Sequence, residues 1–202
     1  MKLLEYTMAP NPRRVRIFLA EKGVEVPLET VDIAKAENRQ PAYLAKNPLG
    51  GVPTLELDDG TCIAESVAIC RYFEELHPEP PLFGTDARDR GLVEMWNRRM
   101  ELEVFTLIAQ VFRNGHEFFK GRIEQVPEFG EVCRRSVTKR LEWLDGELAG
   151  RDFVAGDRFT VADITAMVGI DFGRVSDIRI APDQKNLARW HESVSSRPSA
   201  KA

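Results

Sequence analysis

Residues 50–66 read GGVPTLELDDGTCIAES, and this stretch decides more about the fold than any other part of the chain. Two short apolar runs flank an Asp-Asp-Gly turn at 58–60, and Asp-Gly between such runs predicts a β-hairpin. Pro53 cannot donate a ladder hydrogen bond, so we expect it at the first residue of a strand. Glu65 and Ser66 then lead into a helical pattern. The hairpin therefore delivers a polar pair to a helix N-terminus, which suits a small anionic peptide.

The composition is that of an ordinary globular protein. The chain has 202 residues, 43% of them hydrophobic and 30% charged, which is enough for one large or two small domains. A net charge of -4 with both signs interspersed argues against nucleic acid as the main partner. No apolar stretch approaches the ~18 residues of a membrane span, and residues 1–6 lack a signal-peptide layout. Cys62, Cys70 and Cys133 form no Cys-x-x-Cys motif, so we expect free thiols and a cytoplasmic protein.

The first 77 residues mix strand and helix signals in the order β-α-β-α-β-β-α. We expect strands over 2–6 and 26–33 and in the two hairpin arms, and helices over 13–22, over 41–45 and after Glu65. Gly23 is placed to end the first helix in a left-handed conformation. A strand-helix-strand unit implies a parallel crossover, whereas the hairpin is antiparallel. The sequence thus predicts a mixed sheet that helices cover.

The proline-rich run HPEPP at 77–81 separates this part from a helical part. Beyond it, strand signals vanish and apolar residues recur at three- and four-residue steps. We expect helices over 86–119, over 131–148, from Thr160 onward and over 186–194. The organisation that follows is an α+β domain over 1–77, a linker over 78–85 and an all-α helical bundle over 86–202.

A capping motif marks the start of one helix in the second half. Thr160 can accept from the backbone N–H of Asp163, whose carboxylate can reach back to the Thr160 N–H. Phe159 and Ile164 fall where a hydrophobic staple would lock the entry of the chain. We interpret this motif as a determinant of folding rather than as a ligand site.

The order of elements and the motifs together resemble the cytosolic glutathione transferases. The resemblance rests on the turn before Arg13-Arg14-Val15-Arg16, on Asn47-Pro48-Leu49-Gly50-Gly51-Val52-Pro53, on Glu65-Ser66 before Ala68-Ile69, and on the Thr160 capping box. It covers essentially the whole chain, and the N-terminal motif is similar to those of the bacterial nu-like and theta-like classes. It implies a thioredoxin-like first domain, glutathione as co-substrate, no metal, and a homodimer.

The resemblance also implies how glutathione is held. Val52 would offer its backbone N–H and C=O to the cysteinyl unit, and Pro53 would follow a cis peptide bond. Glu65 would meet the α-ammonium of the γ-glutamyl unit, and Ser66 would hold its α-carboxylate at the helix N-terminus. Ser66 is equally suited to be a plain helix N-cap, and both roles stay open.

The residues expected at the glycyl end of the ligand depart from the pattern of the family. Arg39 aligns with a basic residue that contacts the terminal carboxylate in related classes. Gly51 stands where the family often has Lys or Gln, and it has no side chain to offer. This departure shifts the expected contact onto Arg39 and Gln40.

The largest departure from the pattern of the family concerns the group that activates the thiol of glutathione. A free thiol has a pKa near ~8.5, so an enzyme of this kind needs a donor that stabilises the thiolate. The serine of the theta, zeta and phi-like classes falls on Ala9, which cannot donate. The nu-like enzymes place an asparagine where Asn11 stands, and an amide N–H can stabilise a thiolate without exchanging a proton. We expect Asn11, with Thr7 nearby, to act on the sulfur, although Asn11 between two prolines also suits a turn.

Several apolar residues are candidates for binding a second substrate. Met8 and Pro10 lie in the loop expected over the sulfur, and Phe105 and Phe112 could line an apolar cleft, although such rings also suit a core. The function implied is conjugation of the glutathione thiolate to small hydrophobic electrophiles. Two alternatives stay open, a glutathione-dependent disulfide oxidoreductase and a non-enzymatic glutathione-fold binding or regulatory module.

Overall fold

The computed structural model describes residues 1–202, and these form two compact units. The first contains Met1–Leu82 and Pro198–Ala202, and the second contains Phe83–Arg197. The change of unit falls within the expected linker over 78–85. The last five residues, which the sequence places in the helical domain, instead group with the first unit. No helix combines the length and apolar character that crossing a bilayer requires.

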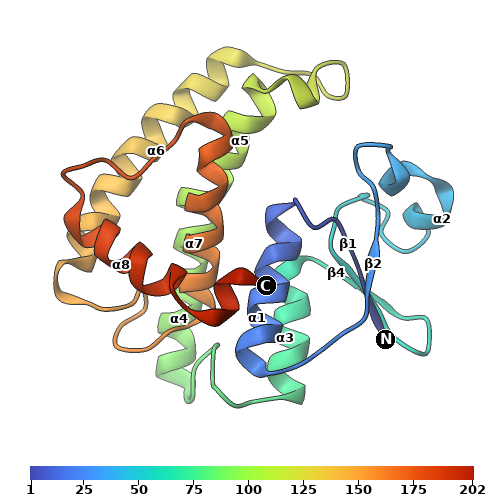
Figure 1. The fold of residues 1–202 in the computed structure, drawn as a ribbon, viewed down its shortest axis with the longest axis horizontal. Coiled ribbons are helices and arrows are strands. Elements are labelled where there is room, and N and C mark those ends of the chain that lie inside the picture. The colour runs from blue at the N-terminus through green and yellow to red at the C-terminus, as the bar shows by residue number, and fades with distance from the viewer. The chain divides into compact units, whose positions relative to one another are not determined.

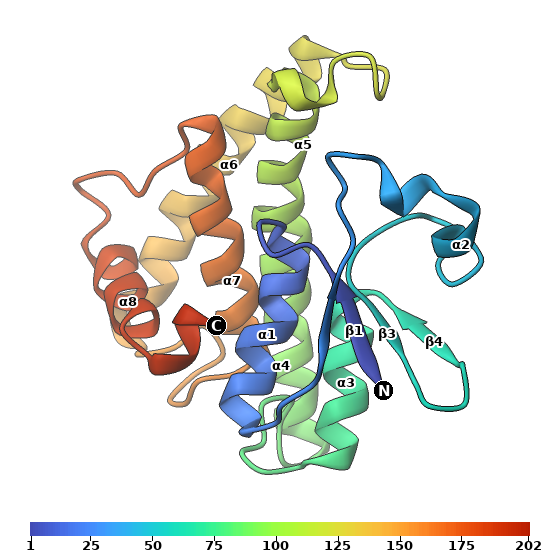
Figure 2. The same cartoon turned by 45° about the vertical axis from the view of Figure 1, so that its right-hand side comes forward.

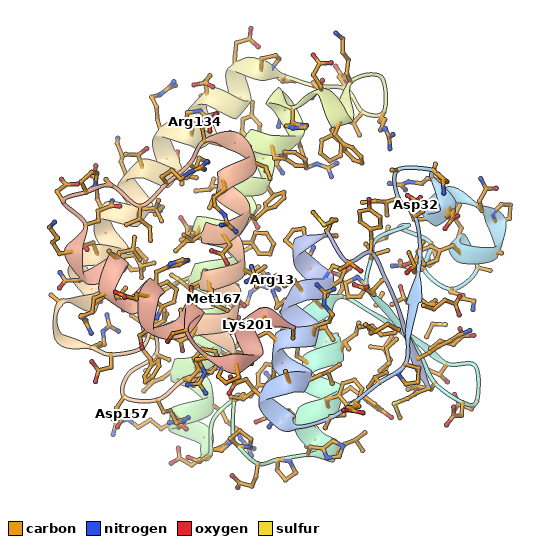
Figure 3. The ribbon with its side chains drawn as sticks, viewed as in Figure 1. Arg13, Asp32, Arg134, Asp157, Met167 and Lys201 are labelled. Carbon is orange, nitrogen blue, oxygen red and sulfur yellow. The ribbon has the colours of Figure 1, made fainter.

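The C-terminal turn η6 (Pro198–Lys201) is held to the first unit by helix α1 (Pro10–Lys22). Arg13 donates from Nη2 to the carbonyl oxygen of Ala200 at 3.2 Å, and Figure 3 shows Arg13 beside the C-terminal turn. The Ser199 hydroxyl, in a residue only 7% exposed, donates to the carboxylate of Glu21. The chain therefore leaves the first unit near residue 82 and returns to it at residue 198.

A four-stranded sheet forms the centre of the first unit. Its strands are β1 (Lys2–Glu5), β2 (Leu28–Thr30), β3 (Thr54–Glu56) and β4 (Cys62–Ala64). The order is β2-β1-β3-β4, with β1 and β2 parallel and the other pairs antiparallel. The predicted mixed sheet and hairpin are thus confirmed. β2 covers only three of the eight residues expected, because it is an exposed edge strand that pairs with β1 alone.

Helices cover this sheet on both faces. The helices of the first unit are α1, α2 (Pro41–Leu44) and α3 (Ser66–Leu76), with a 3-10 turn η1 (Glu37–Arg39) before α2. α1 and α3 lie side by side on one face and α2 lies on the other (Figures 1 and 2). α1 ends at Gly23, whose φ of 65° confirms the predicted left-handed cap. It begins three residues earlier than expected, because Pro10 suits the first turn of a helix.

The second unit is helical throughout. Its elements are α4 (Ala87–Arg99), η2 (Met100–Phe105), α5 (Thr106–Gly115), η3 (Glu117–Phe119), α6 (Pro127–Glu147), η4 (Leu148–Gly150), α7 (Val161–Phe172), η5 (Gly173–Ser176) and α8 (Lys185–Ser195). The single helix expected over 86–119 is wrong in detail, because η2 is π-helical and His116 is extended. At η2, α7 approaches so closely that a Cβ built on Gly169 would lie 2.9 Å from the Cβ of Phe105.

The capping box at the start of α7 is confirmed and belongs to a larger network. Thr160 N–H donates to Asp163 Oδ2 at 2.9 Å. The other oxygen, Oδ1, accepts from the N–H of Val154 at 2.8 Å and from Nε1 of Trp190 at 2.9 Å. Every residue from 161 to 170 is buried, so α7 is the central helix of this unit. Arg134 of α6 likewise reaches across to the carbonyl of Ser176 at 2.7 Å (Figure 3).

Candidate active site

The register of the sheet brings three loops to one edge. Leu4 of β1 pairs with Thr54 at the start of β3, and Thr54 pairs with Ala64 at the end of β4. The loop after β1, the residues before β3 and the residues after β4 therefore leave the sheet at the same edge. These loops carry Thr7, Val52 and Glu65 respectively, with β3 between the other two strands.

The loop before β3 exposes the backbone of Val52. The Val52–Pro53 peptide bond is cis, as the resemblance implies. The carbonyl of the preceding Gly51 accepts from Tyr43 Oη and from Asn47 Nδ2, the latter at 2.9 Å. Neither the N–H nor the C=O of Val52 takes part in a backbone hydrogen bond. An extended peptide can therefore pair with Val52 as an added strand would.

Arg39 lies against the same loop. It donates from Nη1 to the carbonyl of Leu49 at 3.1 Å, and Asn38 Nδ2 donates to the carbonyl of Gly50 at 2.7 Å. Gly50 has a φ of 64°, and a Cβ there would lie 2.8 Å from Arg39 Nη1. Gly50 thus makes room for the guanidinium, which is exposed and keeps further N–H donors. Gln40, also exposed, is the N-cap residue of α2.

Glu65 and Ser66 occupy different positions at the N-terminus of α3. Glu65 is the N-cap residue, with a φ of 68°, and its exposed carboxylate makes no capping bond. Ser66 is the first helical residue and is only 6% exposed. Its hydroxyl oxygen accepts from Arg14 Nη1 at 3.2 Å. The reading of Ser66 as a plain N-cap is therefore wrong, because Glu65 occupies that position.

The loop after β1 corrects the expectation for Thr7. Its hydroxyl donates to Glu5 Oε1 at 2.8 Å, and Arg16 donates to its carbonyl at 3.1 Å. Arg16 also pairs with Glu5, which is 2% exposed. A hydroxyl has one hydrogen to donate, and here it is already committed to a carboxylate. Thr7 therefore holds the loop in place, and it does not offer a donor to a sulfur atom.

Asn11 lies in the first turn of α1 and is exposed. Pro10 and Pro12 have no N–H, and Ala9 at the N-cap position has no side chain that can cap the helix. The N–H and the amide of Asn11 make no hydrogen bond within the chain. At the start of α1, Asn11 thus offers two hydrogen-bond donors, its backbone N–H and its side-chain amide. Met8, which directly precedes the N-cap residue Ala9, is 81% exposed.

The phenylalanines of the second unit divide into core and partly exposed rings. Phe105 is 5% exposed and packs against Gly169. It therefore belongs to the hydrophobic core and does not line a ligand surface. Half-buried rings surround Phe112, and we call Phe112, Phe118, Phe119 and Phe172 the aromatic cluster. Its ring centroids lie 5.1 Å (Phe112–Phe172), 5.2 Å (Phe112–Phe119) and 6.4 Å (Phe112–Phe118) apart.

Sequence reasoning missed the polar residues that hold these loops, namely Glu5, Arg14, Arg16, Asn38 and Tyr43. One signal was available for Arg14. It stands four and eight residues before Phe18 and Lys22, so helical spacing places all three on one stripe of α1. All three are buried or nearly so. For Asn38 and Tyr43 no local pattern distinguishes a loop-binding side chain from an exposed one.

Comparisons with known proteins find matches to both units of the chain. Residues 9–76 match the glutathione S-transferase N-terminal domain, and residues 98–198 match the C-terminal domain. Glutathione S-transferase 2 of Saccharomyces cerevisiae is 35% identical over 205 residues, which cover 100% of this chain and 88% of that protein.

Two crystal structures are similar over nearly their full length. A glutathione S-transferase domain-containing protein of Marinobacter aquaeolei has a TM-score of 0.95 at 37% identity, covering 98% of this chain and 99% of that one. Gtt2 from Saccharomyces cerevisiae has a TM-score of 0.95 at 35% identity, covering 100% and 99%. The chain belongs to the glutathione S-transferase family.

Proposed function

We propose that the protein conjugates the thiolate of glutathione to small hydrophobic electrophiles. One observation carries the proposal: a single sheet edge presents the unpaired backbone of Val52 next to Glu65 and Ser66 at the start of α3. These groups complement a short zwitterionic peptide. The named relatives are transferases, which supports transfer over disulfide reduction and over a binding module without activity.

Each part of glutathione has a matching group. The cysteinyl backbone pairs with Val52, the α-ammonium meets the Glu65 carboxylate, and the α-carboxylate lies at Ser66, where orphan N–H groups favour an anion. The guanidinium of Arg39 faces the glycyl carboxylate. Charge-assisted hydrogen bonds of this kind are about twice as strong as neutral ones, so the two ends dominate the affinity.

The reaction itself needs little from the protein. The thiol proton leaves to solvent, the sulfur lone pair forms a bond to the electrophilic carbon, and a leaving group departs with its bonding pair or a double bond accepts the electrons. Asn11 supplies donors that stabilise the thiolate before attack. For the apolar acceptor, Met8 and Pro10 lie close to Asn11 in the chain, and Met8 is 81% exposed.

Parallel assays separate the three functions. Purified protein is given glutathione with a chlorinated aromatic acceptor in one assay and with a small disulfide in the other. We expect activity on the acceptor. Activity on the disulfide alone would assign the reductase function, and tight glutathione binding with neither activity would assign the binding module.

Replacing Asn11 by Ala is expected to raise the apparent pKa of bound glutathione. The thiolate loses its amide donor, while the groups that hold the two ends of the peptide remain. Glutathione affinity should change less than about threefold, since the thiol makes a small part of the contacts. Ultraviolet absorbance of the thiolate, followed against pH in the binary complex, measures the shift. An unchanged titration curve would remove Asn11 from this role.

For a homodimer, we propose an apolar stripe of the second unit as the interface. Leu92, Met95 and Leu102 recur at three- and seven-residue steps along α4 and η2, and they are 42%, 37% and 48% exposed. Arg98 and Glu101 beside them form an ion pair within the chain, so the stripe itself is apolar and can meet its own copy across a two-fold axis.

Met95→Asp is therefore expected to shift the protein from dimer to monomer in sedimentation velocity, because the interface would bury a carboxylate. Val132→Asp on α6 is the matched control, since Val132 is 47% exposed and lies outside the stripe. Dissociation by the control alone would place the interface on α6.

The three cysteines are free thiols, which supports a cytoplasmic location.

A further inference from the structure

A buried arginine lies behind the site at the start of α3. Arg14 is 1% exposed in the middle of α1, the helix that lies beside α3 (Figures 1 and 2). Its Nη1 donates to Ser66 Oγ at 3.2 Å, across 52 residues of sequence. An arginine has five N–H donors and no acceptor, so the direction of this hydrogen bond is fixed.

That direction determines what Ser66 can give to a ligand. A hydroxyl has one hydrogen and two lone pairs, and the bond from Arg14 occupies a lone pair. Ser66 makes no capping bond to α3, since Glu65 is the N-cap residue. The hydrogen of the Ser66 hydroxyl therefore points away from Arg14 and remains available to an acceptor.

We infer that Arg14 is a positioning residue that fixes Ser66 as a hydrogen-bond donor toward the α-carboxylate of glutathione. The inference rests on the proposed function and adds to it a basis for selectivity. A carboxylate only accepts hydrogen bonds, so it suits a hydroxyl that can only donate. A ligand without an acceptor at this position leaves the Ser66 hydrogen unpaired in a buried place, which costs affinity.

The residues near Arg14 distinguish it from the other buried cation of α1, Lys22. Cys70 lies one turn beyond Ser66, and burial raises the pKa of its thiol to about 12 while the Arg14 charge acts in the opposite direction. Lys22, two turns after Arg14 on the same stripe, is also buried, but it pairs with Glu74 at the far end of α3. The chain thus has two buried cations between α1 and α3, of which only Arg14 contacts Ser66.

Calorimetric titration with two peptides tests the inference. One is glutathione, and the other is γ-aminobutyryl-cysteinylglycine (decarboxy-glutathione), which lacks only the α-carboxylate and keeps the ammonium group. The readout is the ratio of the affinities for glutathione and decarboxy-glutathione. We expect Ser66→Ala to lower this ratio about tenfold and Arg14→Gln to lower it at least threefold.

The double variant shows whether Arg14 affects ligand binding through Ser66 or independently of it. If Arg14 acts through Ser66, Arg14→Gln should have no further effect on the ratio once Ser66 is Ala. Lys22→Gln is the matched control: it removes the other buried cation and should lower the melting temperature without changing the ratio. If Arg14→Gln does not fold, Arg14→Lys replaces it, with an expected drop of at least threefold.

Three results would count against these ideas in different ways. Failure of the unmodified protein to bind glutathione would overturn the proposed function. Normal glutathione binding with the same ratio in every folded Arg14 variant would overturn the inference alone. Additive losses in the double variant would also overturn it, because they would show that Arg14 does not act through Ser66.

Discussion

Asp163→Ala is expected to lower the free energy of unfolding of the helical unit by about 3–5 kcal/mol, or to prevent folding altogether, because each buried donor left without an acceptor costs about 1–3 kcal/mol. The carboxylate is completely buried and joins three segments: Val154, Thr160 and Trp190 all donate to it at 2.8–2.9 Å. Burial raises the pKa of Asp163, and these donors lower it. Removing the carboxylate leaves three buried N–H donors without an acceptor. Urea unfolding followed by tryptophan fluorescence measures the loss.

Asp163→Asn and Asp157→Ala complete this experiment. The asparagine keeps the size of the side chain but turns an NH₂ group toward a donor, so we expect most of the same loss. Asp157 lies six residues earlier and is exposed (Figure 3), so its removal should change stability by less than about 0.5 kcal/mol. Equal losses at Asp157 and Asp163 would contradict the importance of the network.

Glu65→Gly is expected to change stability and affinity in opposite directions. Glu65 has a φ of 68° and ψ of 117°, a conformation that costs a residue with a Cβ about 1–3 kcal/mol. Glycine removes that cost, and its greater freedom in the unfolded chain offsets part of the gain, so unfolding should become harder by about 1 kcal/mol. Glutathione affinity should fall roughly 10- to 100-fold, because the α-ammonium loses its carboxylate partner.

Glu65→Ala separates the two effects. Alanine removes the carboxylate and keeps the strained backbone, so it should bind glutathione as weakly as the glycine variant without the gain in stability. Titration calorimetry and denaturant unfolding on the same samples give both quantities. A glycine variant that binds glutathione normally would show that the carboxylate at position 65 is not a ligand contact.

Local signals explain what the sequence predicts well. The Asp-Gly turn, the glycine cap at Gly23 and the Thr160 capping box each involve residues within a few positions, and all three are present. The break of the long helix at η2 is different, because it accompanies a close approach of α7. No pattern within 86–119 reveals a neighbour that lies 64 residues further along.

The same distinction holds for the site. Glu65, Ser66 and Val52 follow from a contiguous motif, and the register of the sheet brings them to one edge. The contact between Arg14 and Ser66 spans 52 residues and needs knowledge of which face of α1 meets α3. Thr7 was misassigned for a related reason, since nothing in the sequence shows that Glu5 is buried and accepts its hydrogen.

The return of residues 198–202 to the first unit has a consequence for biosynthesis. In the order of synthesis, the helical unit is an insertion inside the glutathione-binding unit, since the latter holds both the first 82 residues and the last five. A ribosome that has made residues 1–82 has produced that unit without Ser199 and Ala200, which bond Glu21 and Arg13 in the folded protein. Domains usually fold in order from the N-terminus as they emerge. Here the unit that contains residues 1–82 emerges before the helical unit but is completed only after it.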